Sequence, residues 1–263
     1  MTRPTPWHGR AVLGLGWGGF AGLSGDNVHH AHHALQICVA DRGCTVEDET
    51  GRRTDGPVLV VNARATHRLL PSMRPVSLWY LDPQTRLART LVTTRQALST
   101  AWPVAVPPER LSLEAIFQTR RPTTEALAAA LDLTLAPAPV DARMADAVAW
   151  LHARRGEAIS ASTAAHATGL SVSRYLHRLR AYTGLPFRPY VRWLRILLAI
   201  ESVLAGSKLT EAAHAAGFAD AAHFSRTFRR HFGAAPLTVL GQVQPVSGRS
   251  QIVQAPGRPH PVR

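Results

Sequence analysis

The chain has 263 residues, long enough for two ordinary domains, and its 46% hydrophobic and 18% charged content excludes a disordered protein. Its formal net charge of +13 is uneven: residues 1–140 carry 14 Lys and Arg against 11 Asp and Glu, and residues 141–263 carry 16 against 6. A basic excess on one half points to a polyanionic partner. The absence of any long apolar run excludes a membrane-spanning helix.

The stretch AVLGLGWGGFAGL at 11–23 is rich in glycine and lacks a convincing cleavage site, so we do not expect a signal peptide. It matches G-x-G-x-x-G, but no helix pattern and no βαβ unit surround it, which favours a glycine-rich strand edge or loop over a dinucleotide site. Cys38 and Cys44 are too few for a disulfide framework and fit a reducing cytoplasm.

From about residue 11 to residue 100 the sequence predicts strands. The segments ALQICVA, GPVLVVNA and PVSLWYLD are short, rich in β-branched and aromatic residues, and bounded by Gly, Pro or Asp. Several such strands with turns between them predict a barrel or a sandwich.

Four histidines, a glutamine and a distant fifth histidine stand out in this half: His29, His30, His32 and His33, then Gln36, then His67. Alternate residues of a strand share a face, so we expect His30, His32 and Gln36 to line up on one side. The pattern resembles the two motifs of cupins, with Gln36 where metal-binding cupins usually have Glu. A divalent transition metal suits such imidazoles, but the sequence favours an effector pocket lined by His30, His32, Gln36 and His67, with no catalytic metal and no cofactor.

After about residue 107 the sequence pattern changes from one typical of strands to one typical of helices. PERLSLEAIFQ and PTTEALAAALDLTL predict helices that begin near a Pro, and we expect this region, 107–133, to supply a dimer contact. APAPV at 136–140 is the best domain boundary. We therefore expect an N-terminal domain over 1–105, a helical segment and linker over 106–140, a helical domain over 141–240, and a disordered tail over 241–263.

The helical domain contains an internal repeat. TAAHATGLSVSRYLHRLRAYTG at 163–184 parallels EAAHAAGFADAAHFSRTFRRHFG at 211–233: each has an alanine-rich helix, a Gly turn, a capping Ser171 or Asp220, and a basic helix that ends at Gly184 or Gly233. Two helices joined by a short turn form a helix-turn-helix, whose second helix is shaped for the DNA major groove. Between the copies, FRPYVRWLRILLAIESVLAG predicts a long, broadly apolar helix that joins them into one rigid body.

These features resemble the AraC/XylS family of bacterial transcriptional regulators over about 141–239, with Gly217-Phe218, Phe224-Ser225-Arg226, Phe228-Arg229-Arg230, Phe232-Gly233 and Pro236 as the most specific matches. Ala212 and His214 depart from the larger apolar residues usual in the family. The resemblance implies an α+β chain, a cupin-like β-barrel followed by an all-α tandem helix-turn-helix domain. It implies DNA contacts from Ser173, Arg174, Leu176, His177 and Arg180 in the first basic helix, and from Ala221, Ala222, His223, Ser225, Arg226 and Arg229 in the second.

Sequence-specific recognition of double-stranded DNA, with a small-molecule effector in the N-terminal barrel, is the function that the sequence favours. RNA polymerase and a second copy of the chain are further partners that this function allows, and no membrane is expected. A cupin-type metalloenzyme with an attached DNA-binding module is the alternative, but Gln36 and the absence of an acid/base pair count against it. A non-specific nucleic-acid or membrane-surface binder would explain the charge and leave the repeat unexplained.

Overall fold

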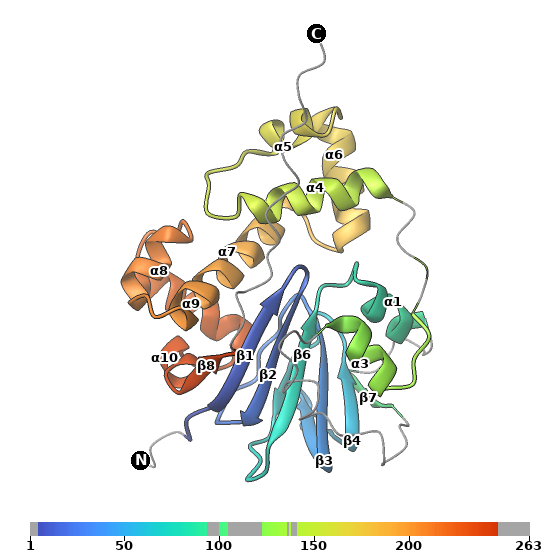
Figure 1. Ribbon diagram of the computed structural model, residues 1–263, viewed down its shortest axis with the longest axis vertical. Coiled ribbons are helices and arrows are strands. Elements are labelled where there is room, and N and C mark those ends of the chain that lie inside the picture. Colours follow the sequence, from blue (N-terminus) through green and yellow to red (C-terminus); the bar gives the residue numbers. More distant parts are fainter. Residues whose placement is uncertain (1–4, 94–99, 105–122, 136, 138–140, 247–263) are drawn as a thin grey trace.

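The computed structural model describes residues 5–93, 100–104, 123–135, 137 and 141–246 of the chain. A twisted sheet from the N-terminal half forms one end of the molecule, and the C-terminal helices lie along one side of it and extend beyond it (Figure 1). The predicted α+β fold class, a sheet domain followed by tandem helix-turn-helix units, is confirmed. None of the described helices is long and apolar enough to cross a membrane.

The sheet has eight described strands, and seven of them follow the order β7-β4-β3-β6-β2-β1-β8, with β5 paired to β3. Neighbouring strands are antiparallel except for β1 and β8. The path ends at β7 and β8, so the described sheet stays open where a barrel was expected. The strands are β1 His8–Gly14, β2 Trp17–Leu23, β3 Leu35–Asp48, β4 Arg53–Val61, β5 His67–Leu69, β6 Val76–Leu81, β7 Ala101–Pro103 and β8 Val243–Pro245.

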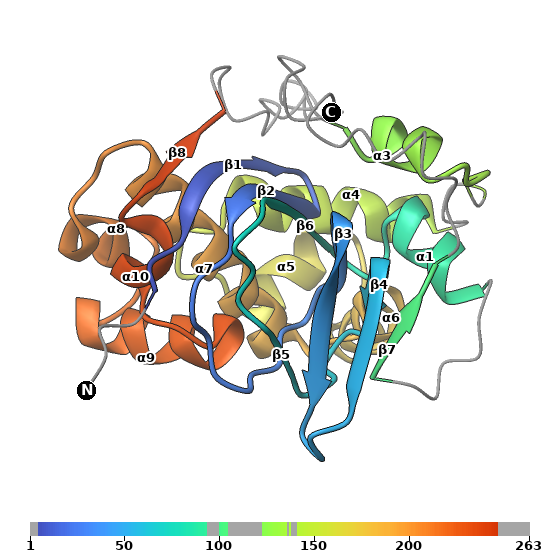
Figure 2. The ribbon, with the colours of Figure 1, turned by 90° about the horizontal axis from the view of Figure 1, so that it is seen from below.

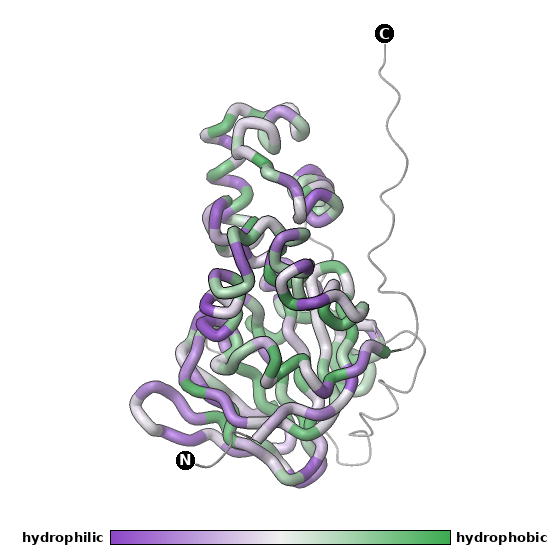
Figure 3. Tube along the Cα trace, turned by 90° about the vertical axis from the view of Figure 1, so that its left-hand side faces the viewer, coloured by the Kyte–Doolittle hydropathy of each residue, from purple (hydrophilic) through white to green (hydrophobic). Residues whose placement is uncertain are grey.

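The glycine-rich stretch forms the β1–β2 hairpin rather than a nucleotide-binding loop. Its turn contains Gly16 at φ 74°, a left-handed conformation that glycine adopts without strain. The three segments predicted as strands coincide with β3, β4 and β6, whose buried side chains form the centre of the sheet. Figure 3 shows hydrophobic residues gathered mainly in the interior of the molecule, with hydrophilic residues more frequent on its outside.

Two helices close one side of the sheet. Helix α1, Arg86–Thr93, falls in a region expected to be strands, and that expectation was wrong: Leu87 and Leu91 lie one turn apart and pack against Trp79. Helix α3, Thr124–Ala130, lies within the helix predicted at 122–135 and buries Leu127 in the same cluster. The helix predicted at 108–118 and most of the linker at 136–140 lie outside the described residues.

The C-terminal half contains seven described helices around one apolar core: α4 Ala142–Ala153, α5 Ala161–Ala167, α6 Val172–Thr183, α7 Phe187–Leu204, α8 Leu209–Ala215, α9 Ala221–Phe232 and α10 Pro236–Leu240. After α10 the chain returns to the sheet, where Val243–Pro245 form β8 beside β1. The expected disordered tail over 241–263 was therefore wrong at its start, because Val243 is buried and the free edge of β1 accepts a partner strand.

Candidate nucleic-acid interface

The first helix-turn-helix unit, α5 and α6, is built from local signals that the sequence displays. Gly169 takes φ 64° in the turn, and the Ser171 side chain accepts a hydrogen bond from the Arg174 backbone N–H at the start of α6. Tyr175 and Leu179 are fully buried and fix one face of α6 to the core. Gly184 ends the helix at φ 78°. The opposite face of α6 is left to solvent.

The second unit, α8 and α9, repeats this arrangement. Gly217 takes φ 74°, and the Asp220 carboxylate accepts the His223 backbone N–H at 2.6 Å. Phe224 and Phe228 are buried and anchor α9. Ala212, where a larger apolar residue is usual, is nevertheless completely buried in α8, so its small side chain allows close packing.

Helix α7 separates the two units and fixes their spacing. Its 18 residues span about 27 Å at 1.5 Å per residue. Helix α6 packs at its beginning, where Tyr175 meets Phe187 edge to face at 6.1 Å. Arg195, farther along α7, donates a hydrogen bond to the Gly217 carbonyl in the turn of the second unit. The two basic helices are thus held on one rigid support, α6 near the top and α9 beside the sheet in Figure 1.

The solvent-facing sides of α6 and α9 carry the predicted contact residues, and neither helix contains an Asp or Glu. The exposed members are Ser173, Arg174, Leu176, His177, Arg180, Ala222, His223, Arg226 and Arg229, while Ala221 and Ser225 are half-buried. The Ser225 hydroxyl already donates to the Ala221 carbonyl at 2.7 Å, and the His223 ring packs edge to face on Phe218. By contrast, Arg178 on α6 is bound to Asp141.

One exposed residue of α6 was missed. Val172 follows the cap directly and leaves 41% of its surface exposed, beside Leu176 at 36%. Apolar side chains on a recognition helix contact the methyl group of thymine. An apolar residue just after a capping Ser was the signal that could have identified it.

The structure brings the four residues of the predicted effector pocket together, but His30, His32 and Gln36 do not share one strand as expected. His30 and His32 lie in the loop before β3, Gln36 lies on β3, and His67 begins β5. His30 and His67 pair through two backbone hydrogen bonds of 2.9 Å, which draw the loop against β5. The rings of His30, His32 and His67 then form a triangle with centroid distances of 4.5 to 5.7 Å.

These rings are uncharged at neutral pH. Burial, together with a smaller effect of the neighbouring imidazoles, lowers the pKa of His30, His32 and His67 to about 3. Burial also lowers the pKa of the adjacent His33 to about 3. Neutral imidazole is the form that accepts hydrogen bonds or binds metal ions.

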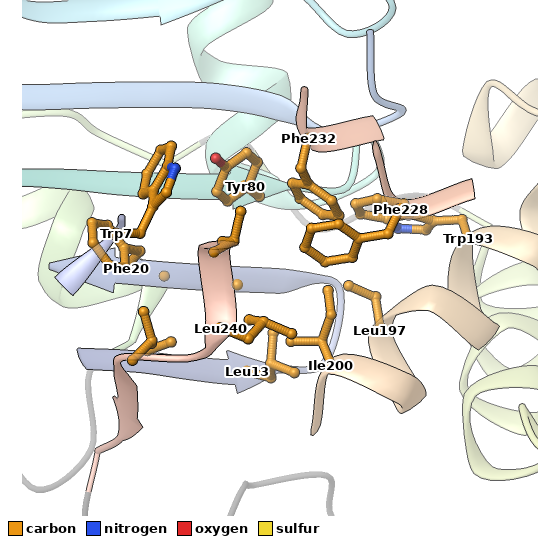
Figure 4. Close-up of a pocket in the computed structure, with 15 residues that line it drawn as sticks. Trp7, Leu13, Phe20, Tyr80, Trp193, Leu197, Ile200, Phe228, Phe232 and Leu240 are labelled. Carbon is orange, nitrogen blue, oxygen red and sulfur yellow. The ribbon is translucent and has the colours of Figure 1, made fainter. Parts of the chain in front are cut away.

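An apolar cavity of about 80 Å³ lies between the sheet and the helices, and sequence reasoning missed it. The residues that line it lie on, or next to, seven elements that are far apart in the chain, so no local sequence pattern could have predicted the cavity. Aromatic rings of Tyr80, Trp193, Phe228 and Phe232 line one side, and aliphatic side chains such as Ile200 line the other (Figure 4). The lining is almost entirely apolar, which suits an uncharged or aliphatic group.

The sheet and the second helix-turn-helix unit are in direct contact. The Val28 N–H donates to the Gly233 carbonyl at 2.9 Å, at the end of α9, and the Phe232 ring packs on Tyr80 at 5.7 Å. Farther along, the Trp193 indole N–H donates to the buried Asp82 carboxylate at 2.8 Å. A change in the sheet can therefore reach α7 and α9 through side chains already in contact.

Comparison with known proteins agrees with this arrangement. Residues 164–242 match a family model described as a helix-turn-helix domain. The chain is 39% identical over 101 residues to the HTH-type transcriptional activator RhaS of Escherichia fergusonii, and 34% identical over 116 residues to RhaS of Salmonella schwarzengrund. These matches cover 38% and 43% of this chain, and 36% and 39% of the relatives, so the chain matches little more than a third of their length.

Over nearly its whole length the chain has the fold of ToxT from Vibrio cholerae. One ToxT structure aligns with a TM-score of 0.54 at 12% identity, covering 92% of this chain and 98% of ToxT. Another, described as bound to an unsaturated fatty acid, aligns with a TM-score of 0.51 at 12% identity over 93% of this chain and 100% of ToxT. At this identity the likeness concerns the fold.

Proposed function

From a C-terminal part that is a tandem helix-turn-helix domain of the AraC/XylS type, we propose that the whole chain is a sequence-specific DNA-binding transcriptional regulator. The observation that carries the proposal is the pair of matched basic helices, each capped, anchored and exposed in the same way, on one rigid support. A single basic helix would be a common surface feature. Two copies with the same internal spacing indicate a shared task.

The spacing suits two successive segments of the major groove. Helix α7 spans about 27 Å, and one turn of B-DNA spans about 34 Å. The two units differ at equivalent positions, since α6 carries Val172, Leu176 and His177 where α9 carries Ala221, Ser225 and Arg226. One chain should therefore recognise a non-palindromic site with two dissimilar halves, and need no second copy to do so.

Within α9 we assign different roles to two arginines. Arg226 lies in the first half of the helix, where recognition helices contact base edges, and an arginine there most often binds a guanine through two hydrogen bonds. Arg229 lies nearly one turn later and is placed for a phosphate, as is Arg180 on α6. Phosphate contacts release counterions, so affinity should fall steeply with salt.

We also propose that the apolar cavity receives the apolar part of a small-molecule effector. The cavity is walled by α7 and α9 on one side and by the sheet on the other, so a ligand would change how α9 packs against the sheet. A ToxT structure of the same fold is described as bound to an unsaturated fatty acid, which supports an aliphatic ligand class. Octanoate should raise the thermal midpoint of the wild type and not that of Ile200→Phe, whose larger side chain fills the cavity; equal shifts in both would reject this location.

We also propose a homodimer, but the structure supports it with fewer available residues than the sequence indicated. Helix α3 uses Leu127 and Ala128 inside its own core, so its apolar face is already covered. The remainder of the expected dimer region lies outside the described residues. Contact with RNA polymerase is likewise proposed from the resemblance alone.

The experiment that tests the regulator function is selection of bound fragments from a random DNA pool by the full chain. We expect enrichment of one asymmetric motif with two conserved blocks about one helical turn apart. Retention of fragments without any shared motif, at the same level as competitor DNA, would indicate a general polyanion binder and reject the proposal.

A further inference from the structure

A second cavity, of about 140 Å³, lies at the junction between the sheet and the helices. Its basic residues come from four separate segments: His33 from the loop before β3, Arg64 from the loop after β4, Arg192 from α7 and His231 from α9. We call it the basic cavity, and no Asp or Glu is among the described residues that line it. Only Trp193 lines both this cavity and the apolar one, so the two are chemically distinct.

Two arginines give the basic cavity a fixed positive charge. Arg64 and Arg192 are exposed to solvent, and neither forms an ion pair with an Asp or Glu of the described part of the chain. By contrast, Arg155 and Arg178 of the helical domain are each bound to a carboxylate. A guanidinium group stays charged at any physiological pH. The cavity therefore holds two positive charges that no described side chain neutralises.

The backbone of Arg64 is strained. Arg64 takes φ 66°, a left-handed conformation that among the described residues only Asp132 shares outside glycine. Its backbone N–H donates to the His32 carbonyl at 2.8 Å, which holds this conformation in place. The conformation costs an arginine about 1 kcal/mol, and a glycine would adopt it without strain. Strained residues of this kind cluster at ligand sites, so the Arg64 side chain is the part with a task.

The two histidines of the basic cavity add polar atoms that other residues do not use. His33 is 5% exposed and packs edge to face on Tyr190 and Trp193 at 6.0 Å, yet its Nε2 has no hydrogen-bond partner among the described residues. Buried polar atoms normally have a partner. Nδ1 of His231 lies 2.8 Å from the Thr227 carbonyl and donates to it, which leaves Nε2 as the free nitrogen of that ring.

These groups repel one another when they are charged. Burial lowers the pKa of His33 and of His231, and the positive charges of Arg64 and Arg192 respectively add to this effect. Each arginine is thus close enough to a ring of its own side of the cavity to oppose protonation of that ring. An anion placed between the four groups would replace this repulsion by attraction.

We propose that the basic cavity binds the phosphate group of a small phosphomonoester, through the guanidinium groups of Arg64 and Arg192 and the ring nitrogens of His33 and His231. A phosphomonoester carries a charge of about −1.5 to −2 at neutral pH, which matches the two arginines, whereas a carboxylate would neutralise only one. The planar fork of arginine forms two parallel hydrogen bonds to a phosphate. Apolar side chains at the start of α7 also line the cavity and suit the organic part of the ligand.

The ligand would connect the sheet to α9, a consequence that rests on the proposed DNA-binding function. His33 and Arg64 belong to the sheet side, while Arg192 lies on α7 and His231 lies in the last turn of α9. A phosphate held by both sides would fix the end of the second recognition helix relative to the sheet. It would thereby change the affinity of the chain for DNA.

Calorimetric titration of the full chain with phenyl phosphate, at constant ionic strength, tests the site without reference to DNA. The wild type should bind one phenyl phosphate per chain. Arg64→Gly and Arg192→Gln should each weaken binding roughly tenfold or more, because each removes hydrogen bonds between charged groups. Arg188→Gln is the matched control, since Arg188 is an exposed arginine of α7 that does not line the cavity, and its affinity should equal that of the wild type.

Arg64→Gly relieves the left-handed strain, so a loss of binding in this variant does not arise from unfolding, and a thermal melt checks this. Equal affinity in wild type and Arg64→Gly would overturn the proposal in favour of phosphate binding elsewhere on the basic surface. Two further ligands test the chemical class. Benzoate binding as tightly as phenyl phosphate would overturn it in favour of a carboxylate, and equal affinity for inorganic phosphate would overturn the monoester assignment. The effect of phenyl phosphate on DNA affinity is measured separately, so failure of the regulator function leaves the binding result interpretable.

Discussion

Replacing Trp193 by phenylalanine should loosen the connection between sheet and helices. The Trp193 indole N–H donates to Asp82 at 2.8 Å, and Asp82 is 1% exposed. A hydrogen bond to a charged, buried group contributes about 1.5–3 kcal/mol. Trp193→Phe should therefore lower the free energy of unfolding by that amount in addition to the loss of ring volume.

Trp102→Phe is the control that measures the effect of the lost ring volume alone. Trp102 is 6% exposed, and its Nε1 has no hydrogen-bond partner among the described residues. Both variants are measured by urea denaturation, and the difference between them isolates the hydrogen bond. A change in the midpoint at constant slope marks a change in stability rather than in the unfolded state.

The loss of stability in Trp193→Phe should be larger at higher pH. Burial raises the pKa of Asp82 from 3.8 to about 6, so the folded chain binds a proton there that the unfolded chain releases, and stability falls as pH rises from about 4 to 6. The shift is worth about 3 kcal/mol at full ionisation. Trp193 offsets part of this cost for the ionised form, so Trp193→Phe should be more damaging at pH 7.5 than at pH 5. Equal penalties for both tryptophan variants at both pH values would refute the reasoning.

Two further predictions concern the same junction. Gly233→Ala and Gly184→Ala both force alanine into a left-handed conformation that costs about 1 kcal/mol. Only Gly233→Ala places the new Cβ against the Val28 carbonyl oxygen, so its thermal midpoint should fall clearly further. Equal thermal midpoints for the two variants would show that α9 does not pack on this loop. The pKa is lowered to about 3 in four histidines, which are His30, His32, His33 and His67. Acidification from pH 7.5 to 5.5 should lower the free energy of unfolding by about 1 kcal/mol for each of them, because the unfolded chain binds protons that the folded chain does not. An unchanged or higher urea midpoint at pH 5.5 would contradict those lowered pKa values.

The parts of the fold that depend on local chemistry could be predicted from the sequence. The caps Ser171 and Asp220, and the glycines that end the basic helices, all take the conformations that their residue types favour. The buried strands were evident for the same reason, because β-branched runs between turn residues have few other structures available. The helix-turn-helix repeat could therefore be predicted almost entirely from residues that are neighbours in the sequence.

What escaped prediction depends on partners distant in the chain. Strand β8 forms because β1, more than 200 residues earlier, presents a free edge. Helix α1 was missed because its Leu, Val and Thr residues also fit a strand. The histidine rings do lie together, but the expected strand alignment was wrong, since His30 and His32 lie in a loop that pairs with His67. Their contact with the end of α9 could not be read from either segment alone.

The central claim, that α9 reads DNA sequence, is tested most directly by binding isotherms of wild type, Arg226→Ala and Arg229→Ala on the selected site and on a scrambled duplex at several salt concentrations. Arg226→Ala should lose about 1–3 kcal/mol on the selected site, lose little on the scrambled one, and relax preference at one base pair. Arg229→Ala should weaken both duplexes alike and reduce the salt slope by about one unit. Equal losses on the two duplexes for Arg226→Ala would contradict the claim and leave α9 as a source of charge.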